Sequence, residues 1–133
     1  MTLPIPERLQ DLLTREKRAF AFLALVKKDG TPQVTPIWFD FDGQQFIFNT
    51  ARGRVKDRIM RKHPRVAFVI LDPDNSYRYL QVFGHVVAES EEDGRARIED
   101  LNEKYQCKRE YPVRPGEVRV TYRVEPDRFY PRN

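Results

Sequence analysis

The chain has 133 residues, 40% of them apolar and 33% charged, so it can bury one core and is too apolar to remain disordered. Its single cysteine, Cys107, excludes an internal disulfide and cannot anchor a metal cluster alone, and no run of about 20 apolar residues could cross a membrane. A net charge of +4 suits a small anionic ligand or nucleic acid and does not decide between them.

The first half of the chain predicts a helix followed by a meander of strands. Residues 6–16 carry leucines at helical spacing behind a proline placed for the first turn. Two Asp-Gly turn signals separate three stretches that predict strands, which are 19–27, 32–41 and 46–50. Pro36 removes one backbone donor and therefore indicates an edge strand or a bulge.

The second half predicts two more helices and three more strands. The helices are expected at 54–63 and 91–105, and the strands at 65–71, 77–88 and 118–125. The strand 77–88 is polar on neither face, which suggests packing on both sides. Six strands with short connections favour a mainly β fold, a closed or nearly closed antiparallel barrel with peripheral helices, in a single domain spanning 1–133.

Positive charge gathers where the second helix begins. Seven of the 14 residues from 52 to 65 are basic, opposed only by Asp57, and they are Arg52, Arg54, Lys56, Arg58, Arg61, Lys62 and Arg65. The backbone N–H groups of a helix start favour an anion, and Arg54 and Lys56 lie nearest to that start. A phosphate site, a solvated basic helix face and a nucleic-acid surface all remain open on charge alone.

Few other residues suggest chemistry by themselves. Asn49 and Thr50 could hydrogen-bond a ligand, and Trp38 could stack on a ring, although each also suits an ordinary structural role. The two histidines, His63 and His85, do not have the spacing of metal ligands, and no metal site is expected. Because no catalytic triad, P-loop or carboxylate pair is present, an enzyme here would need a cofactor for the difficult chemistry.

Three segments in order carry a family resemblance: DGTPQVTPIWFDFDG (29–43), FIFNTARGRVKDRIMRKHPRVAF (46–68) and YRYLQVFGHVV (77–87). The chain resembles the pyridoxamine-phosphate-oxidase-like split β-barrel family, and within it the members that use FMN or the deazaflavin coenzyme F-420. The resemblance implies a six-stranded antiparallel split β-barrel. It also implies a homodimer with two cofactor sites at the subunit interface.

The resemblance also implies roles for particular residues. The strand Val34, Thr35, Pro36, Ile37, Trp38 would line the cofactor ring, and Asn49 and Thr50 would reach the ring edge or the ribityl chain. Lys56 matches the phosphate-binding lysine of the family, whose neighbouring arginine falls on Val55, so Arg54 would stand in for it. Tyr79 and Gln81 of the second subunit would complete the site.

The expected function is that of an FMN- or deazaflavin-dependent oxidoreductase acting on a small redox substrate. The C-terminus EPDRFYPRN lacks the second tryptophan that holds pyridoxal phosphate in the vitamin-oxidising members, so a different substrate is implied. No catalytic residue is assigned, and Tyr79 and His85 are candidates only if they face the ring. The additional arginines Arg52, Arg58 and Arg61 could follow the oligoglutamate tail of the deazaflavin.

Two other functions stay open on the sequence. One is a protein that binds or stores a flavin or haem without turnover, and the other is a basic nucleic-acid-binding barrel. We do not expect nucleic acid as a partner, because the strand 77–88 is apolar and no array of stacking aromatic residues lies on one exposed sheet. We do not expect a membrane partner, because no run of about 20 apolar residues is present. The first residues lack the basic start and long apolar run of a signal peptide, so a cytoplasmic location is expected.

Overall fold

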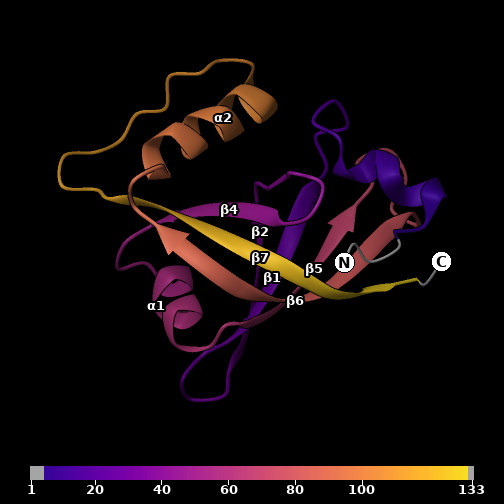
Figure 1. The fold of residues 1–133 in the computed structure, drawn as a ribbon, viewed down its shortest axis with the longest axis horizontal. Coiled ribbons are helices and arrows are strands. Elements are labelled where there is room, and N and C mark those ends of the chain that lie inside the picture. Colours follow the sequence, from indigo (N-terminus) through magenta and orange to yellow (C-terminus); the bar gives the residue numbers. More distant parts are fainter. Residues whose placement is uncertain (1–4, 132–133) are drawn as a thin grey trace.

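Alternating apolar residues and Asp-Gly turns fold the chain into one antiparallel sheet of seven strands with helices around it (Figure 1). The computed structural model describes residues 5–131. In chain order the elements are η1 (Glu7–Leu13), β1 (Phe20–Val26), β2 (Pro32–Ile37), β3 (Asp40–Phe41), β4 (Phe46–Ala51), α1 (Val55–Lys62), β5 (Arg65–Leu71), β6 (Tyr79–Ser90), α2 (Gly94–Gln106) and β7 (Arg119–Tyr130).

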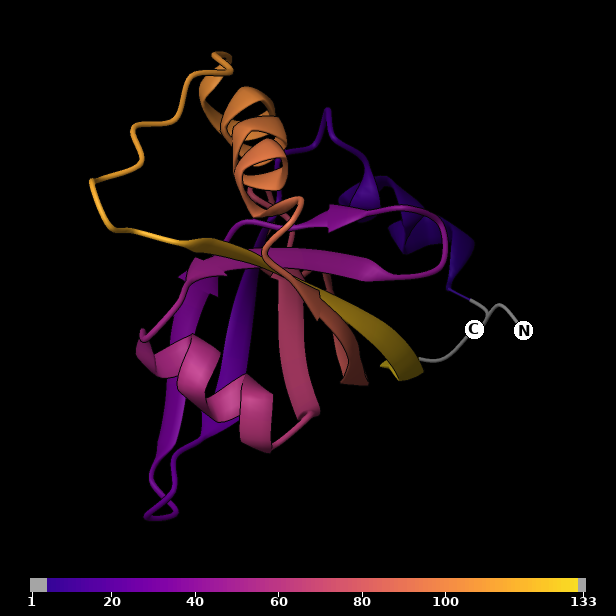
Figure 2. The same ribbon diagram turned by 60° about the vertical axis from the view of Figure 1, so that its left-hand side comes forward.

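The sheet curls because one segment of chain contributes to both of its edges. The strand order is β2-β1-β5-β6-β7-β4-β3, so β2 and β3 lie at opposite edges although only Trp38 and Phe39 separate them in sequence. This curled antiparallel sheet is the predicted split barrel (Figure 2). Pro36 lies on the edge strand β2, as its missing N–H predicted.

Two details of the predicted strands are wrong. The single strand 32–41 is two strands, because the chain leaves β1 after Ile37 and pairs with β4 from Asp40 onward. The strand count is therefore seven and not six. The meander also ends at β2, since β4 pairs with β7 and β3 and makes no ladder with β2. Long-range pairing of this kind leaves no local mark in a sequence.

Alternate side chains of the strands fill the barrel. Phe68 is at the centre of the core, with ring centroids 5.0 Å from Phe46 and 5.1 Å from Phe48 in edge-on contacts. The alternation of apolar and polar residues over 118–125 predicts a strand that is buried on one face only. This prediction is wrong for the first residues of β7, because Arg119 and Thr121 are buried together with the core residues Val120 and Tyr122. The reason is that α2 packs over β7 and β4 and covers their outer face.

The first residue of α2 fixes how closely this helix approaches the sheet. A Cβ atom on Gly94 would lie 2.0 Å from the backbone oxygen of Arg119, so only glycine fits there. The Gly94 carbonyl accepts a hydrogen bond of 2.8 Å from the side chain of Asn49. The start of α2 is thereby tied to both β7 and β4.

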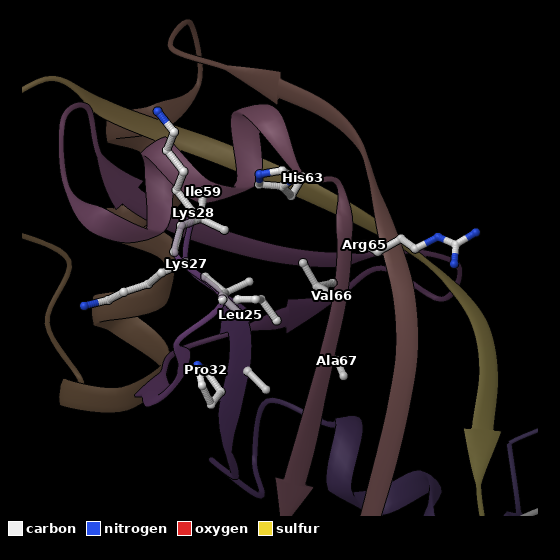
Figure 3. Close-up of a pocket in the computed structure, with 12 residues that line it drawn as sticks. Leu25, Lys27, Lys28, Pro32, Ile59, His63, Arg65, Val66 and Ala67 are labelled. Atoms are coloured by element: carbon white, nitrogen blue, oxygen red, sulfur yellow. The ribbon is translucent and has the colours of Figure 1, made fainter.

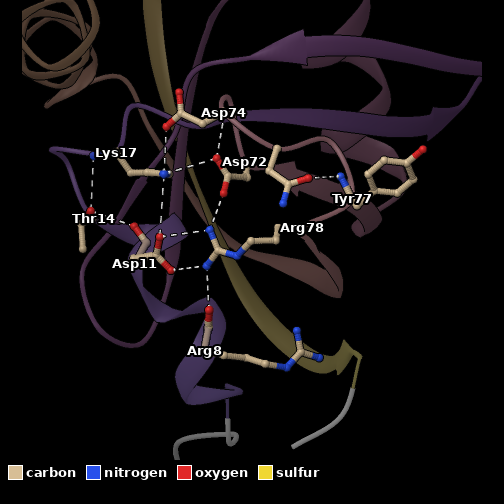
Figure 4. A network of polar contacts seen from close by, with 9 residues as sticks. Arg8, Asp11, Thr14, Lys17, Asp72, Asp74, Tyr77 and Arg78 are labelled. Carbon is tan, nitrogen blue, oxygen red and sulfur yellow. Dashed lines mark hydrogen bonds and ion pairs between the residues drawn. The ribbon is translucent and has the colours of Figure 1, made fainter.

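The N-terminal segment is held to the barrel by a network of charges (Figure 4). The predicted helix 6–16 is a short 3-10 helix, η1, which buries Leu9, Leu12 and Leu13. Arg78, at the entrance to β6, bonds to Asp11 at 2.7 Å and also pairs with the buried Asp72. The ammonium group of Lys17 lies 3.3 Å from the same Asp72, so η1 is joined to the β5–β6 turn.

One face of the sheet carries exposed apolar side chains, and α2 contacts it at Phe20, whose ring stacks on Tyr105. On β1, β2, β5 and β6 the outward side chains line up across the strands in register, in rows that include Pro36, Phe22, Val69 and Gln81, and Val34, Ala24, Ala67 and Phe83. Val34 is 64% exposed and Phe20 43% exposed. Among residues 5–131, no helix has the length and apolarity needed to span a membrane.

Candidate functional site

A cavity of about 450 Å³ lies where β2, β4, α1 and α2 approach one another, and its size is typical of small-molecule sites. It brings together seven of the residues that the sequence analysis singled out: Pro36, Ile37, Trp38, Asn49, Thr50, Arg54 and Lys56. Its remaining walls come from Phe20, Ile98, Leu101, Tyr111 and Arg119.

The start of α1 is fixed beside this cavity by the buried carboxylate of Asp57. Asp57 is 1% exposed and accepts hydrogen bonds from the Gly53 backbone N–H at 2.9 Å and from the Tyr122 hydroxyl at 2.6 Å. Arg52 adds an ion pair at 3.0 Å. Burial alone would raise the pKa of Asp57, but these three donors outweigh it and hold the pKa below its ordinary value.

The start of α1 has no side-chain cap. Arg54 occupies the N-cap position and makes no capping hydrogen bond through its side chain. Asp57 instead accepts from the Gly53 N–H, one residue before the N-cap, which fixes the turn into the helix and leaves the N–H groups of the first helical turn free. Burial and the bond to Asp57 raise the pKa of the Tyr122 hydroxyl, which therefore stays protonated and donates to the carboxylate.

Lys56 brings an uncompensated positive charge to the cavity. Its side chain is half-buried, and within residues 5–131 no carboxylate oxygen lies within 4 Å of its ammonium group. Burial, followed by the charge of Arg54, holds the pKa of Lys56 below its ordinary value. Arg54 has one acidic neighbour, Glu117, and the shortest distance between their charged groups is long, at 3.9 Å. The two cations are placed to receive an anion.

In the folded protein, acids that are distant in sequence neutralise part of the basic cluster at residues 52–65. The interpretation that Asp57 alone opposes it is wrong, because Arg52 also pairs with Glu89 at 2.7 Å and Glu91 at 2.8 Å. Arg61 lies 3.6 Å from the same Glu89. Glu89 is near the end of β6 and Glu91 follows that strand, so both lie far from Arg52 in sequence and a local count of charges misses them. Arg52 and Arg61 are therefore engaged within the protein.

Asn49 lines the cavity with a side chain that is already hydrogen-bonded. Its amide N–H donates to the Gly94 carbonyl at 2.8 Å, and its amide oxygen accepts from Arg119 at 2.9 Å. Arg119 is in turn held by Glu117 at 2.8 Å. The amide thus positions a buried arginine and still has one N–H for a ligand.

An aromatic stack supports two of the residues that line the cavity, Phe20 and Trp38. Tyr105 of α2 stacks on Trp38 at 5.1 Å and on Phe20 at 5.3 Å between ring centroids. Its hydroxyl donates to the Ala19 carbonyl at 2.6 Å, and the neighbouring Lys104 donates to the Phe39 carbonyl at 2.6 Å. Burial lowers the pKa of Lys104 to about 8. These contacts fix the bend between β2 and β3 that presents Trp38.

Four of the predicted residues lie outside the cavity. Val34, Tyr79 and Gln81 point outward from the apolar face of the sheet, and the Thr35 hydroxyl is buried without a hydrogen-bond partner in the described part of the chain. That Tyr79 and Gln81 complete the site of a second subunit stays a prediction. His85 pairs with Asp127 at 2.9 Å and does not line the cavity.

The residues that the sequence analysis missed come mainly from α2 and the loop after it. Ile98 and Leu101 lie in the predicted helix 91–105, and nothing local distinguishes such apolar residues from core positions. Arg119 alternates with apolar residues along β7, so its sequence pattern is that of a solvated side chain. Tyr111 lies in a loop and carries no signal. Only the packing of α2 shows that these residues meet.

A family model described as pyridoxamine 5'-phosphate oxidase matches residues 5–131. The chain belongs to this family. This match confirms the family resemblance that the sequence showed, and it accounts for the split barrel. Because members of one fold can differ in chemistry, family membership alone does not define the substrate.

Solved structures similar to the chain include an "F420 Reductase", with 36% identity and a TM-score of 0.82 over 94% of this chain and 98% of the other. A protein of Listeria innocua named after pyridoxamine 5'-phosphate oxidase is 18% identical, with a TM-score of 0.69 over 92% and 94% of the two chains. A conserved hypothetical protein of Mycobacterium tuberculosis is 23% identical, with a TM-score of 0.72 over 96% and 84%. The last two show the shared fold alone.

Replacing Asp57 tests whether its carboxylate organises the start of α1. We expect Asp57→Asn to lower the free energy of unfolding at pH 7 by roughly 1–3 kcal/mol, because an amide cannot accept as strongly from three donors. Urea denaturation measures this. The exposed control Glu92→Gln should change stability by less than about 0.5 kcal/mol.

The difference in the free energy of unfolding between wild type and Asp57→Asn should depend on pH. The pKa of Asp57 is lowered in the folded state, so its contribution is complete above the unfolded value of about 3.9 and is lost as the pH falls through the folded value. The difference between wild type and Asp57→Asn should therefore narrow in acid. A difference that stays constant from pH 7 to pH 3 would contradict this role.

Proposed function

We propose that the protein is a homodimeric oxidoreductase that binds a flavin-type mononucleotide, either FMN or the deazaflavin coenzyme F-420, in the cavity beside α1. The observation that carries the proposal is the half-buried, uncompensated cation of Lys56 with Arg54 at a helix start that opens onto this cavity. Such a position favours a phosphate, through charge and through the free N–H groups of the first helical turn.

The cavity suits the rest of such a cofactor as well. Pro36, Ile37 and Trp38 offer an apolar wall for a flat ring, and Trp38 is held from behind by Tyr105. β2 is an edge strand, so backbone groups on its open side are free to bond the polar edge of a ring. When bound, the cofactor would supply hydride or electron exchange. The protein would orient it and exclude water.

The 36% identity to a protein named "F420 Reductase" favours the deazaflavin over FMN. Of the three arginines considered for the oligoglutamate tail, Arg52 and Arg61 are paired with acids of β6, and Arg58 does not line the cavity. The substrate is proposed to be a small molecule that stacks on the ring. A cytoplasmic location is part of the proposal and suits the exposed free thiol of Cys107.

The homodimer is proposed from the exposed apolar side chains on one face of the sheet. Phe22, Val69 and Phe83 lie on this face together with Tyr79 and Gln81. A contiguous exposed apolar face of this extent is typical of a subunit interface. Packing a second copy there would carry Tyr79 and Gln81 toward the other subunit, which is how the family resemblance expects each site to be completed.

A second candidate is a protein that binds the cofactor without turnover. It is favoured by the composition of the cavity, whose lining residues include no carboxylate and no imidazole. Proton transfer would then depend on Tyr111, the second subunit or the substrate itself. Purified protein that binds the reduced cofactor, but leaves its absorbance unchanged with a broad set of small oxidants, would support this candidate.

Neutralising Lys56 tests the proposed phosphate site. We expect Lys56→Gln to weaken binding of FMN or coenzyme F-420 by about 10- to 100-fold, since a charged hydrogen bond contributes roughly 1.5–3 kcal/mol. Titration calorimetry gives the dissociation constants, and the exposed Arg95→Gln serves as the matched loss of charge. Equal affinities for wild type and Lys56→Gln would contradict the assignment.

The affinity should also depend on pH in a direction set by Lys56. Its pKa is lowered in the free protein and a bound phosphate would raise it, so binding takes up a proton above the free-state pKa. The affinity of wild type should thus fall as the pH rises through that pKa. The affinity of Lys56→Gln should not fall over the same range of pH.

A charge placed in the apolar face tests the homodimer. We expect Val69→Glu to convert a dimer into monomers, because two copies would bury an unpaired carboxylate at the interface. Sedimentation velocity measures the mass, and circular dichroism checks that the variant remains folded. Arg95→Glu, on the exposed face of α2, should leave the dimer intact. A monomeric wild-type protein would exclude the proposed interface.

A further inference from the structure

A second pocket lies away from the cofactor cavity, between α1, the β1–β2 turn and the start of β5 (Figure 3). Its volume is about 590 Å³, within the usual range for small-molecule sites. An adjoining hollow of about 560 Å³ shares Lys27, Lys28, Ile59 and His63 with it. We call the two together the hairpin pocket. It shares no lining residue with the cofactor cavity.

The floor of the hairpin pocket is aliphatic. Leu25, Ile59 and Val66 meet there from β1, α1 and β5, and Figure 3 shows their side chains converging. Pro32 adds a further apolar surface at the turn. The apolar floor indicates an occupant with a hydrocarbon portion, because a purely polar ligand would lose its hydration against these side chains without compensation.

The rim of the pocket is cationic and lacks counter-ions. Five basic side chains surround it, and none has a carboxylate oxygen within 4 Å in residues 5–131; they are Lys27, Lys28, Arg58, Lys62 and Arg65. Figure 3 shows Lys27, Lys28 and Arg65 extending outward around the mouth. The one acid of the turn, Asp29, accepts the Thr31 N–H at 2.9 Å.

The contrast within α1 shows that this arrangement is specific to one side of the helix. Arg61 pairs with Glu89 of β6 at 3.6 Å, and Arg52 just before the helix pairs with three acids. Arg58 and Lys62, which follow each other at a spacing of four residues and therefore share one face, have no such partner in the described chain. Mutual repulsion among the rim cations would be relieved by a bound anion.

We propose that the hairpin pocket binds an amphiphilic organic anion, with its hydrocarbon part on the floor formed by Leu25, Ile59 and Val66 and its charged head among the rim cations. A medium-chain carboxylate or alkyl sulfate has this chemistry. A nucleic acid suits the pocket less well, because no phenylalanine, tyrosine or tryptophan lines it for base stacking. The site shares no lining residue with the proposed cofactor cavity, and its wall at Ala24 and Ala67 borders the face proposed for the dimer.

Methyl-detected NMR with decanoate tests the proposal directly. We expect saturable shifts confined to the methyl groups of Leu25, Ile59 and Val66 and their neighbours. Decanol, which has the same chain without the charge, should bind at least about fivefold more weakly. The triple variant Lys27→Gln/Lys28→Gln/Lys62→Gln should lose roughly tenfold in decanoate affinity, since each exposed charge contributes a modest amount.

Matched controls separate this site from general charge effects and from the cofactor site. Arg95→Gln/Lys108→Gln/Arg114→Gln removes three exposed cations elsewhere and should leave decanoate affinity unchanged. Lys56→Gln should also bind decanoate normally, so the proposed function and the hairpin pocket can fail separately. The proposal is overturned if decanol binds as well as decanoate, if oligoglutamate competes without an apolar chain, or if the floor methyl groups do not shift.

Discussion

The candidate site depends on one buried carboxylate. Asp57 accepts hydrogen bonds from a backbone N–H, from the Tyr122 hydroxyl and from Arg52, and so connects the start of α1 to β7 and to the loop that precedes the helix. A buried charge is stable only with such partners. Because these contacts fix where the helix begins, they also fix where Arg54 and Lys56 enter the cavity.

The pairing of charges divides the basic residues into two classes. Arg52, Arg61 and Arg119 have acidic partners and act as structural cations. Lys56 and the cations of the hairpin pocket have none within residues 5–131, although they are drawn from the same helix and its neighbours. Since leaving like charges uncompensated costs free energy, the second class marks the surfaces where anionic ligands are best accommodated.

Much of the fold could be predicted, because its signals are local. The Asp-Gly turns, the edge position of Pro36 and the apolar strand 65–71 follow from conformational preference and periodicity. The break at Trp38 and Phe39 could not be predicted, since it is decided by pairing of Asp40 with Ile47 on the opposite edge of the sheet. The same holds for the burial of Arg119 under α2.

The sequence predicted one part of the candidate site and missed another. The segments that carry the family motifs brought Pro36, Trp38 and Lys56 into one cavity, whereas the contribution of α2 could not be anticipated from an ordinary amphipathic pattern. The acids that neutralise Arg52 lie on β6, so a linear count of charges overestimated the positive field. Tertiary contacts, and not residue types, distinguish structural from functional cations here.

The most direct test of this account is a crystal structure of the protein with FMN or coenzyme F-420. The account predicts that the phosphate lies within hydrogen-bond distance of the Lys56 ammonium and the first turn of α1, with the ring against Pro36 and Trp38. A phosphate bound elsewhere on the barrel, or a cofactor whose phosphate makes no contact with Lys56, would contradict it.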